Sequence, residues 1–126
     1  MATLPEIAAL SWENREGPVV LTTVDSNGIP NTIYVTCVKK VSDDKIVVAD
    51  NKMQKTQANI MAGCTVSLLY ITKEKKAFQL KGSAQYQTSG KIFDEMKNVW
   101  LDTKYPGRAA VVIDIEEVYS GDEKLV

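Results

Sequence analysis

The sequence predicts a mainly β fold with about six strands and two or three short helices, curled into a small barrel. Segments rich in β-branched and aliphatic residues recur along the chain, and such residues favour strands. Short turns rich in Gly, Asn, Asp and Pro separate these segments, and short connections favour antiparallel pairing. Apolar strands that are joined by tight turns are typical of a small closed barrel.

The N-terminal residues predict a short helix. Thr3 can cap this helix, and Pro5 is tolerated in a first helical turn. We expect the helix to run to about Trp12, because Gly17-Pro18 stops any helical structure that reaches it.

A hairpin and a third strand are predicted next. Residues 19–24 are rich in Val and Thr and form the first strand. Asn27-Gly28 supplies the positive φ that a hairpin turn needs, so a long strand over residues 29–40 returns antiparallel to the first. A turn at residues 42–44 leads into the strand at 45–49.

The middle of the chain predicts a short helix between strands. The polar loop of residues 50–53 opens this helix, and Gly63 suits the position just after its end. Residues 64–71 form the next strand, and the alternation of residues 77–87 indicates a strand with one wetter face. Gly82 within that strand indicates a bulge or a bend.

The last third of the chain predicts a helix and a final core strand. Residues 88–90 offer a cap, and residues 105–107 end the helix. The helix carries an apolar stripe at helical spacing, made of Ile92, Phe93, Met96, Val99 and Trp100. Residues 109–115 are the last core strand.

Length and composition indicate one domain over residues 1–126, long enough for a sizeable core. The formal charge of -1 gives no basic field of the kind that attracts nucleic acid. No apolar run approaches the length that spans a membrane, and the N-terminus lacks the design of a signal peptide. We therefore expect a cytoplasmic protein that binds neither nucleic acid nor membrane.

The chain has no histidine and two cysteines, Cys37 and Cys64. The absence of histidine excludes a Ser-His-Asp triad, a Cys-His dyad and a histidine-ligated haem. Two thiols alone do not favour a zinc site, and we predict no metal site. Both cysteines lie at predicted strands, so we expect buried thiols rather than a disulfide. Any redox chemistry would need a reactive group brought in from outside.

One stretch has the residue types of an anion site. Lys55 and Thr56 stand at the predicted start of a helix, where free N–H groups and the helix dipole favour an anion. The aliphatic strand beside them could carry a flat apolar ring. The alternative for Lys55 and Thr56 is the solvated first turn of a surface helix.

Three motifs carry a family resemblance that covers nearly the whole chain. They are Asn31-Thr32, Ile46-Val47-Val48 and Met53-x-Lys55-Thr56-x-Ala58-Asn59. With them the chain resembles the split β-barrel flavoproteins of the pyridoxamine 5′-phosphate oxidase-like superfamily, and it is most similar to the small FMN-binding proteins of anaerobic bacteria. The resemblance implies a six-stranded antiparallel split β-barrel of Greek-key type that forms a homodimer, with FMN at the interface.

The resemblance also implies a set of cofactor-binding residues and no catalytic side chain. Carried over by position, the set is Asn31, Thr32, Lys55 and Thr56 for phosphate and ribityl oxygens, and Asp50, Asn51, Lys52 and Met53 for the isoalloxazine ring, partly through backbone N–H groups. Ile33 stands where the small FMN-binding proteins tend to have an aromatic residue.

The function that the resemblance implies is electron or hydride transfer through bound FMN, as in a flavin-dependent oxidoreductase. A nicotinamide or a redox protein would be the electron donor. The true oxidases bind pyridoxamine phosphate with His and Arg residues, and this chain has no His and only Arg15 and Arg108, so that activity is not expected. The alternatives are a flavin-binding or sensing module without turnover, and a barrel that holds a deazaflavin or no cofactor.

Overall fold

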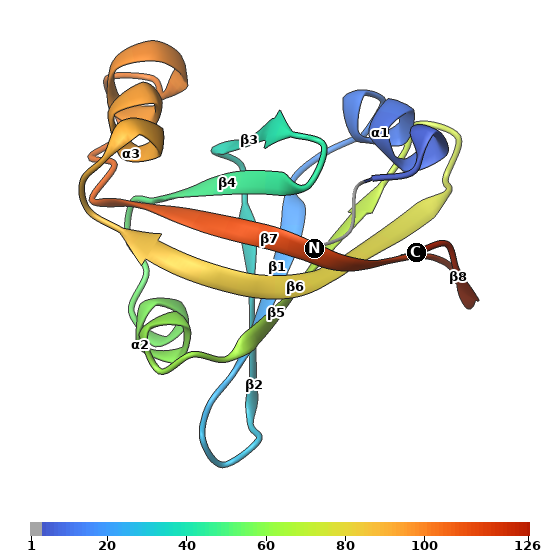
Figure 1. Cartoon of the computed structure of the whole chain (residues 1–126), viewed down its shortest axis with the longest axis horizontal. Coiled ribbons are helices and arrows are strands. Elements are labelled where there is room, and N and C mark those ends of the chain that lie inside the picture. Colours follow the sequence, from blue (N-terminus) through green and yellow to red (C-terminus); the bar gives the residue numbers. More distant parts are fainter. Residues whose placement is uncertain (1–3) are drawn as a thin grey trace.

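The computed structural model describes residues 4–126, and its strands form one curled antiparallel sheet (Figure 1). In chain order the strands are β1 (Val19–Val24), β2 (Pro30–Val35), β3 (Val38–Ser42), β4 (Lys45–Asp50), β5 (Thr65–Ile71), β6 (Ala77–Gln87), β7 (Ala109–Ser120) and β8 (Glu123–Lys124). The helices are α1 (Glu6–Glu13), α2 (Lys55–Met61) and α3 (Lys91–Glu95), and α3 continues directly into the π-helix η1 (Met96–Trp100).

The order of the strands makes the sheet curl into a half-barrel. Neighbouring strands follow the order β2-β1-β5-β6-β7-β4-β3, and β8 pairs with β7. The edges β2 and β3 are therefore at opposite ends of the sheet, yet only Thr36 and Cys37 separate them along the chain. Since Val35 and Val38 are three residues apart, their Cα atoms lie within about 11 Å of each other. The two edges approach at this point, although within residues 4–126 no ladder pairs β2 with β3.

The main core lies on the concave face of the sheet. Inward-facing side chains alternate with outward-facing ones along β1 and β5, as the pleat of a strand requires. Ala8 and Trp12 of α1 pack into the same core, and the Tyr70 hydroxyl donates to the Ala8 carbonyl at 3.0 Å. The largest fully buried members of this core are Trp12, Leu21, Ile46, Leu68, Phe78, Leu80, Ile113 and Ile115.

A second, smaller core covers the other face of β4 and β7. Val47 and Val112 pack there against Met96 and Leu101, which belong to η1 and the residue after it. β4 and the first half of β7 are thus buried on both faces, which explains why their sequences are nearly continuous apolar runs instead of alternating ones.

The described part of the chain contains eight strands, so the prediction of six was wrong. The single strand predicted over residues 29–40 is β2 followed by β3. Val19, the first residue of β1, pairs with Val35. Beyond Val35 the chain has no partner left in β1, and Val38 pairs with Val48 of β4 instead. The last core strand also runs on to Ser120, and β8 returns beside its end.

Two glycine predictions are confirmed. Gly28 has φ +78 in the β1–β2 turn, where the Asp25 carboxylate accepts from the N–H groups of Asn27 and Ile29 at 2.8 and 2.9 Å. The ladder between β6 and β7 shifts register at Gly82. A Cβ at Gly82 would stand 1.9 Å from the Asp114 carbonyl oxygen, so the bulge brings two backbones too close for a side chain.

The helices differ from the prediction at their ends. Thr3 lies outside the described residues, and α1 begins at Glu6 directly after Pro5. The helix predicted after residues 88–90 starts at Lys91 but changes to a π-helix at Met96, with no side-chain cap at Gly90. No helix among residues 4–126 is long and apolar enough to span a membrane.

Candidate functional site

A cavity of about 410 Å³ lies between edge strand β2 and the loop that joins β4 to α2. We call it the β2–α2 cavity. The residues that line it are Asn31, Ile33, Tyr34, Val35, Thr36, Cys37, Ala49, Asn51, Lys52, Met53, Gln54, Lys55 and Thr56. Its volume is within the range of small-molecule and cofactor sites.

Seven of the nine predicted site residues line this cavity, and Thr32 and Asp50 do not. Thr32 alternates with Asn31 and Ile33 along β2, and its Oγ1 lies 3.1 Å from Oγ1 of Thr22 on the neighbouring strand. Asp50 has no exposed surface. The carry-over by position therefore located the cavity but overlooked the direction of these two side chains.

The predicted set of cofactor-binding residues left out six residues that line the cavity. These are Tyr34, Val35, Thr36, Cys37, Ala49 and Gln54. Four of them continue the chain directly beyond Ile33, so the cavity follows β2 to its end and into the corner before β3. No signal in the sequence marked these four, because the break between β2 and β3 is set by where β1 ends beside them.

One end of the cavity is polar and positively charged. Asn31 Nδ2 donates to Thr56 Oγ1 at 3.0 Å, which joins β2 to the first turn of α2. Because this oxygen accepts from Asn31, the Thr56 hydroxyl proton remains available for a ligand. Lys55, next to Thr56 in the chain, adds an exposed ammonium group, and Lys52 adds a second one elsewhere in the lining. No acidic side chain within residues 4–126 lines the cavity, so its charge is positive in a chain of net charge -1.

The rest of the wall is largely apolar and includes Ile33, Val35, Ala49 and Met53. Val35 and Met53 are 8% and 7% exposed, so they form fixed surface instead of mobile side chains. Such a wall suits a flat apolar group.

The backbone of the loop is only partly free to bind a ligand. The Met53 N–H donates to the Asp50 carboxylate at 2.7 Å, so it is not available to a ligand. The backbone N–H groups of Lys52 and Gln54 have no protein acceptor in the part of the chain described. Of the predicted backbone donors, the Lys52 N–H could therefore donate to a ligand, whereas the Met53 N–H could not.

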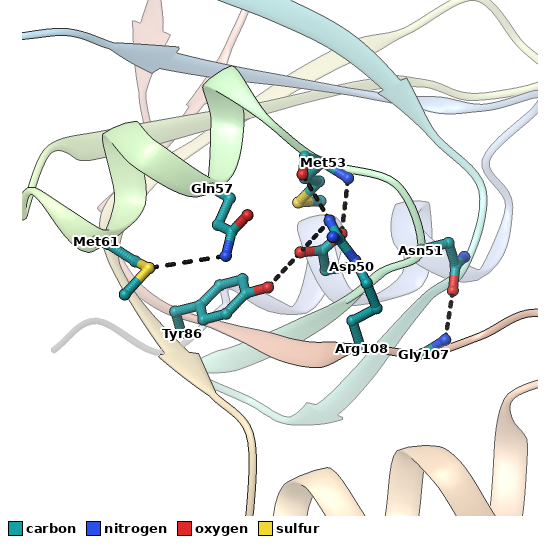
Figure 2. Close-up of polar contacts among 8 residues, drawn as sticks. All are labelled: Asp50, Asn51, Met53, Gln57, Met61, Tyr86, Gly107 and Arg108. Carbon is teal, nitrogen blue, oxygen red and sulfur yellow. Dashed lines mark hydrogen bonds and ion pairs between the residues drawn. The ribbon is translucent and has the colours of Figure 1, made fainter.

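The buried carboxylate of Asp50 is surrounded by donors from three parts of the chain (Figure 2). Arg108 Nη2 lies 3.0 and 3.2 Å from its two oxygens. The Tyr86 hydroxyl on β6 donates to Oδ2, and the Met53 N–H donates to Oδ1. These contacts satisfy a charge that has no access to water.

Two of these partners have shifted pKa values. The hydrogen bond and the charge of Asp50 raise the pKa of Arg108. Burial, followed by the hydrogen bond to Asp50 and its charge, raises the pKa of Tyr86 to about 12. Tyr86 and Arg108 lie 36 and 58 residues after Asp50, and no spacing in the sequence pairs them with it.

The two residues directly before β7 also hold the loop through their backbone N–H groups. The Arg108 N–H donates to the Asp50 carbonyl at 2.7 Å, and the Gly107 N–H donates to Asn51 Oδ1 at 3.0 Å. Gly107 has φ +53, and a Cβ there would stand 2.6 Å from a methyl carbon of Leu101. A side chain at this position would disturb the contact that holds Asn51.

Asn59, the last residue of the third motif, and Cys37 of the cavity lining have structural contacts. Asn59 Nδ2 donates to the buried Thr23 Oγ1 at 3.0 Å, which fixes α2 against β1. Cys37 is a half-buried thiol at the end of the cavity, and Asn51 Nδ2 donates to its Sγ at 3.4 Å. Cys37 and Cys64 are both free thiols, but they are half-buried and not buried as predicted.

All residues that line the cavity lie within the part of the chain that matches a known protein family. A family model described as pyridoxamine 5′-phosphate oxidase matches residues 5–121. The uncharacterized protein MJ0282 of Methanocaldococcus jannaschii is 32% identical over 122 residues, covering 93% of this chain and 80% of that protein.

Solved structures share the fold. A HupZ protein of Group A Streptococcus has a TM-score of 0.81 at 19% identity, covering 93% of this chain and 98% of the other. An FMN-binding protein from Syntrophomonas wolfei subsp. wolfei has a TM-score of 0.75 at 21% identity, covering 91% of this chain and 83% of the other. At these identities the likeness concerns the arrangement of the chain.

We predict that Tyr86→Phe lowers the free energy of unfolding by about 1–3 kcal/mol at pH 8, because Asp50 loses a buried donor. The folded-state pKa of Tyr86 is raised to about 12. The contribution of the neutral hydroxyl is therefore fully present below the ordinary tyrosine pKa of about 10 and is lost as the pH rises towards 12. Urea unfolding at pH 8, 10 and 11 measures this.

The matched control is Tyr34→Phe, whose ring is 76% exposed and whose hydroxyl has no protein partner in the described chain. We expect this variant to follow the wild type at each pH. Equal stability of Tyr86→Phe and wild type at pH 8 would contradict the role given to Tyr86.

Proposed function

Because the chain belongs to the pyridoxamine 5′-phosphate oxidase family, we propose that it binds FMN in the β2–α2 cavity and serves in electron or hydride transfer. One observation carries the proposal: a single cavity combines a cationic, hydroxyl-bearing end with an apolar wall. FMN has the matching division between a dianionic phosphate and a flat ring. The fold is also shared with a protein from Syntrophomonas wolfei that binds FMN.

The polar end fits a phosphate. Lys55 would supply charge, and Thr56 would donate its hydroxyl proton, which is free because Asn31 occupies the oxygen as an acceptor. Hydrogen bonds from a charged donor to phosphate are among the strong ones in proteins. Asn31 keeps a second N–H for the same ligand or for its sugar-alcohol chain.

The apolar wall fits the ring. Ile33 and Val35 on β2 and Met53 on the loop would contact its faces, and the free N–H groups of Lys52 and Gln54 would suit the polar edge. Bound FMN would supply the redox chemistry. The side chains of the cavity would set its position, its access to solvent and its surroundings.

We further propose that the protein forms a homodimer through the outer face of β2, β1 and β5. Cross-strand pairing aligns Tyr34, Val20 and Leu69 in one row, and Tyr34 and Leu69 are 76% and 43% exposed. A row of exposed apolar side chains beside an edge strand marks an interaction surface. Tyr34 also lines the cavity, so a second copy on this face would stand next to the proposed cofactor.

The first test is retention of FMN by the purified protein in gel filtration. We expect co-elution of about one FMN per chain, because the cavity supplies one phosphate end and one wall. Protein that retains a deazaflavin but not FMN, or neither, would contradict the FMN assignment. Reduction of the bound FMN by NADH or NADPH, with reoxidation by an added acceptor, supports the oxidoreductase. Binding without turnover with these donors or with a redox-protein donor points to a flavin-binding or sensing module.

The double variant Lys55→Ala, Thr56→Ala is predicted to weaken FMN binding by about 100-fold or more, since two phosphate donors are lost. Quenching of flavin fluorescence during titration measures the dissociation constant, and circular dichroism checks the fold. Thr103→Ala, Lys104→Ala is the matched control, because this exposed Thr-Lys pair lies outside the cavity. An unchanged FMN affinity in the folded Lys55, Thr56 variant would remove the phosphate assignment.

Leu69→Lys is predicted to convert the dimer to a monomer, because it places a charge in the apolar row without changing the core. Light scattering after gel filtration should give twice 13.9 kDa for the wild type and 13.9 kDa for the variant. Val99→Lys is the control, since Val99 is 76% exposed on η1 and lies outside the row. A wild-type protein that is monomeric in the presence of FMN would contradict the proposed assembly.

A further inference from the structure

The loop of residues 51–54 is held by contacts from outside its own segment. It joins β4 to α2 and contributes four residues to the wall of the β2–α2 cavity. Both polar backbone groups of Met53 are occupied: its N–H by the Asp50 carboxylate at 2.7 Å and its carbonyl by Arg108 Nη2 at 2.6 Å. The position of this wall therefore depends on residues that do not line the cavity.

We propose that Asp50, Tyr86 and Arg108 are positioning residues for the cofactor, which act together as a clamp that fixes Met53 and the cavity wall (Figure 2). The inference rests on the proposed FMN site. None of the three side chains lines the cavity, so the clamp acts through the loop and does not contact the ligand.

Arg108 is the central member, because one nitrogen serves three acceptors. Nη2 contacts both Asp50 oxygens and the Met53 carbonyl, which ties the end of β4 to the middle of the loop. Loss of this group leaves a fully buried carboxylate without its counter-charge and a loop carbonyl without its donor. We expect the loop to move in response, because movement lets the Met53 carbonyl reach another donor or water.

Tyr86 and the backbone complete the arrangement from the opposite side. The Tyr86 hydroxyl reaches the second oxygen of Asp50 from β6, and the Arg108 N–H holds the Asp50 carbonyl at 2.7 Å. The carboxylate thus has partners on each side and cannot turn without breaking one of them. Because the carboxylate is fixed, the Met53 N–H can reach its acceptor in only one position of the loop.

The test compares Arg108→Met, Asp50→Asn and the double variant. The readouts are the FMN dissociation constant and, in ligand-free protein, the hydrogen-exchange rate of the Met53 amide, which is called loop exchange below and reports the bond to Asp50. We expect each single variant to weaken FMN binding and to speed loop exchange by about 10-fold or more, as for lost hydrogen bonds to a charged group. The fold loss of FMN affinity in the double variant should be smaller than the product of the fold losses in the two single variants, because the double variant leaves no unpaired charge.

The control is Arg15→Met, the same change at the only other arginine of the chain. Arg15 lies over the Trp12 ring at 4.2 Å and donates to the Trp12 carbonyl, away from the cavity. We expect it to lower thermal stability while FMN affinity and loop exchange stay at wild-type values. Arg108→Lys should recover part of the affinity, since a lysine restores the charge but not both contacts.

Three outcomes decide between a clamp and a contact of stability alone. Wild-type loop exchange in Arg108→Met would overturn the proposal, whatever the FMN affinity. The proposal would also be overturned if the loss of FMN affinity in the double variant equalled the product of the two single losses. If the wild type itself fails to bind FMN, the proposed function fails, and loop exchange still decides whether the clamp fixes Met53.

Discussion

The buried carboxylate of Asp50 is the interaction on which the candidate site depends. Asp50 ends β4 directly before the loop that lines the cavity, and its carboxylate receives donors from that loop, from β6 and from the residue before β7. A carboxylate without exposed surface is stable only when it is paired. Removing Arg108 would leave this buried charge without its counter-charge, which is strongly destabilising. The contacts of Asp50 thus link β4, Tyr86 of β6 and Arg108 in one arrangement.

The cavity is a consequence of how the sheet curls. A sheet with β2 and β3 as its edges, and two residues between those edges, must bring them together at one corner. The edge strand β2 there faces the loop after β4, and the cavity lies between them. The bond from Asn31 to Thr56 joins the two sides at one point and leaves the rest of the cavity open to a ligand.

The chemistry of the cavity divides along its length. The Lys55 ammonium group and a free hydroxyl proton lie where β2 meets α2, and aliphatic side chains and Met53 form the wall beyond them. Membership of the pyridoxamine 5′-phosphate oxidase family and this division favour the same class of ligand, a phosphorylated molecule with a flat ring. Both arginines are occupied elsewhere, Arg15 at Trp12 and Arg108 at Asp50, so lysines carry the positive charge of the site.

The sequence by itself determined most of the elements and the place of the cavity. Asn27-Gly28 marked a turn with positive φ and Gly82 a close approach of two backbones, both of which favour glycine, and seven residues carried over by position line the cavity. Only the tertiary structure decided that β2 and β3 are separate edges, because that depends on where β1 ends beside them. Tertiary structure alone also decided that Asp50 turns inward to Tyr86 and Arg108. Contacts over 36 and 58 residues follow from the order of strands in the sheet, which no local pattern records.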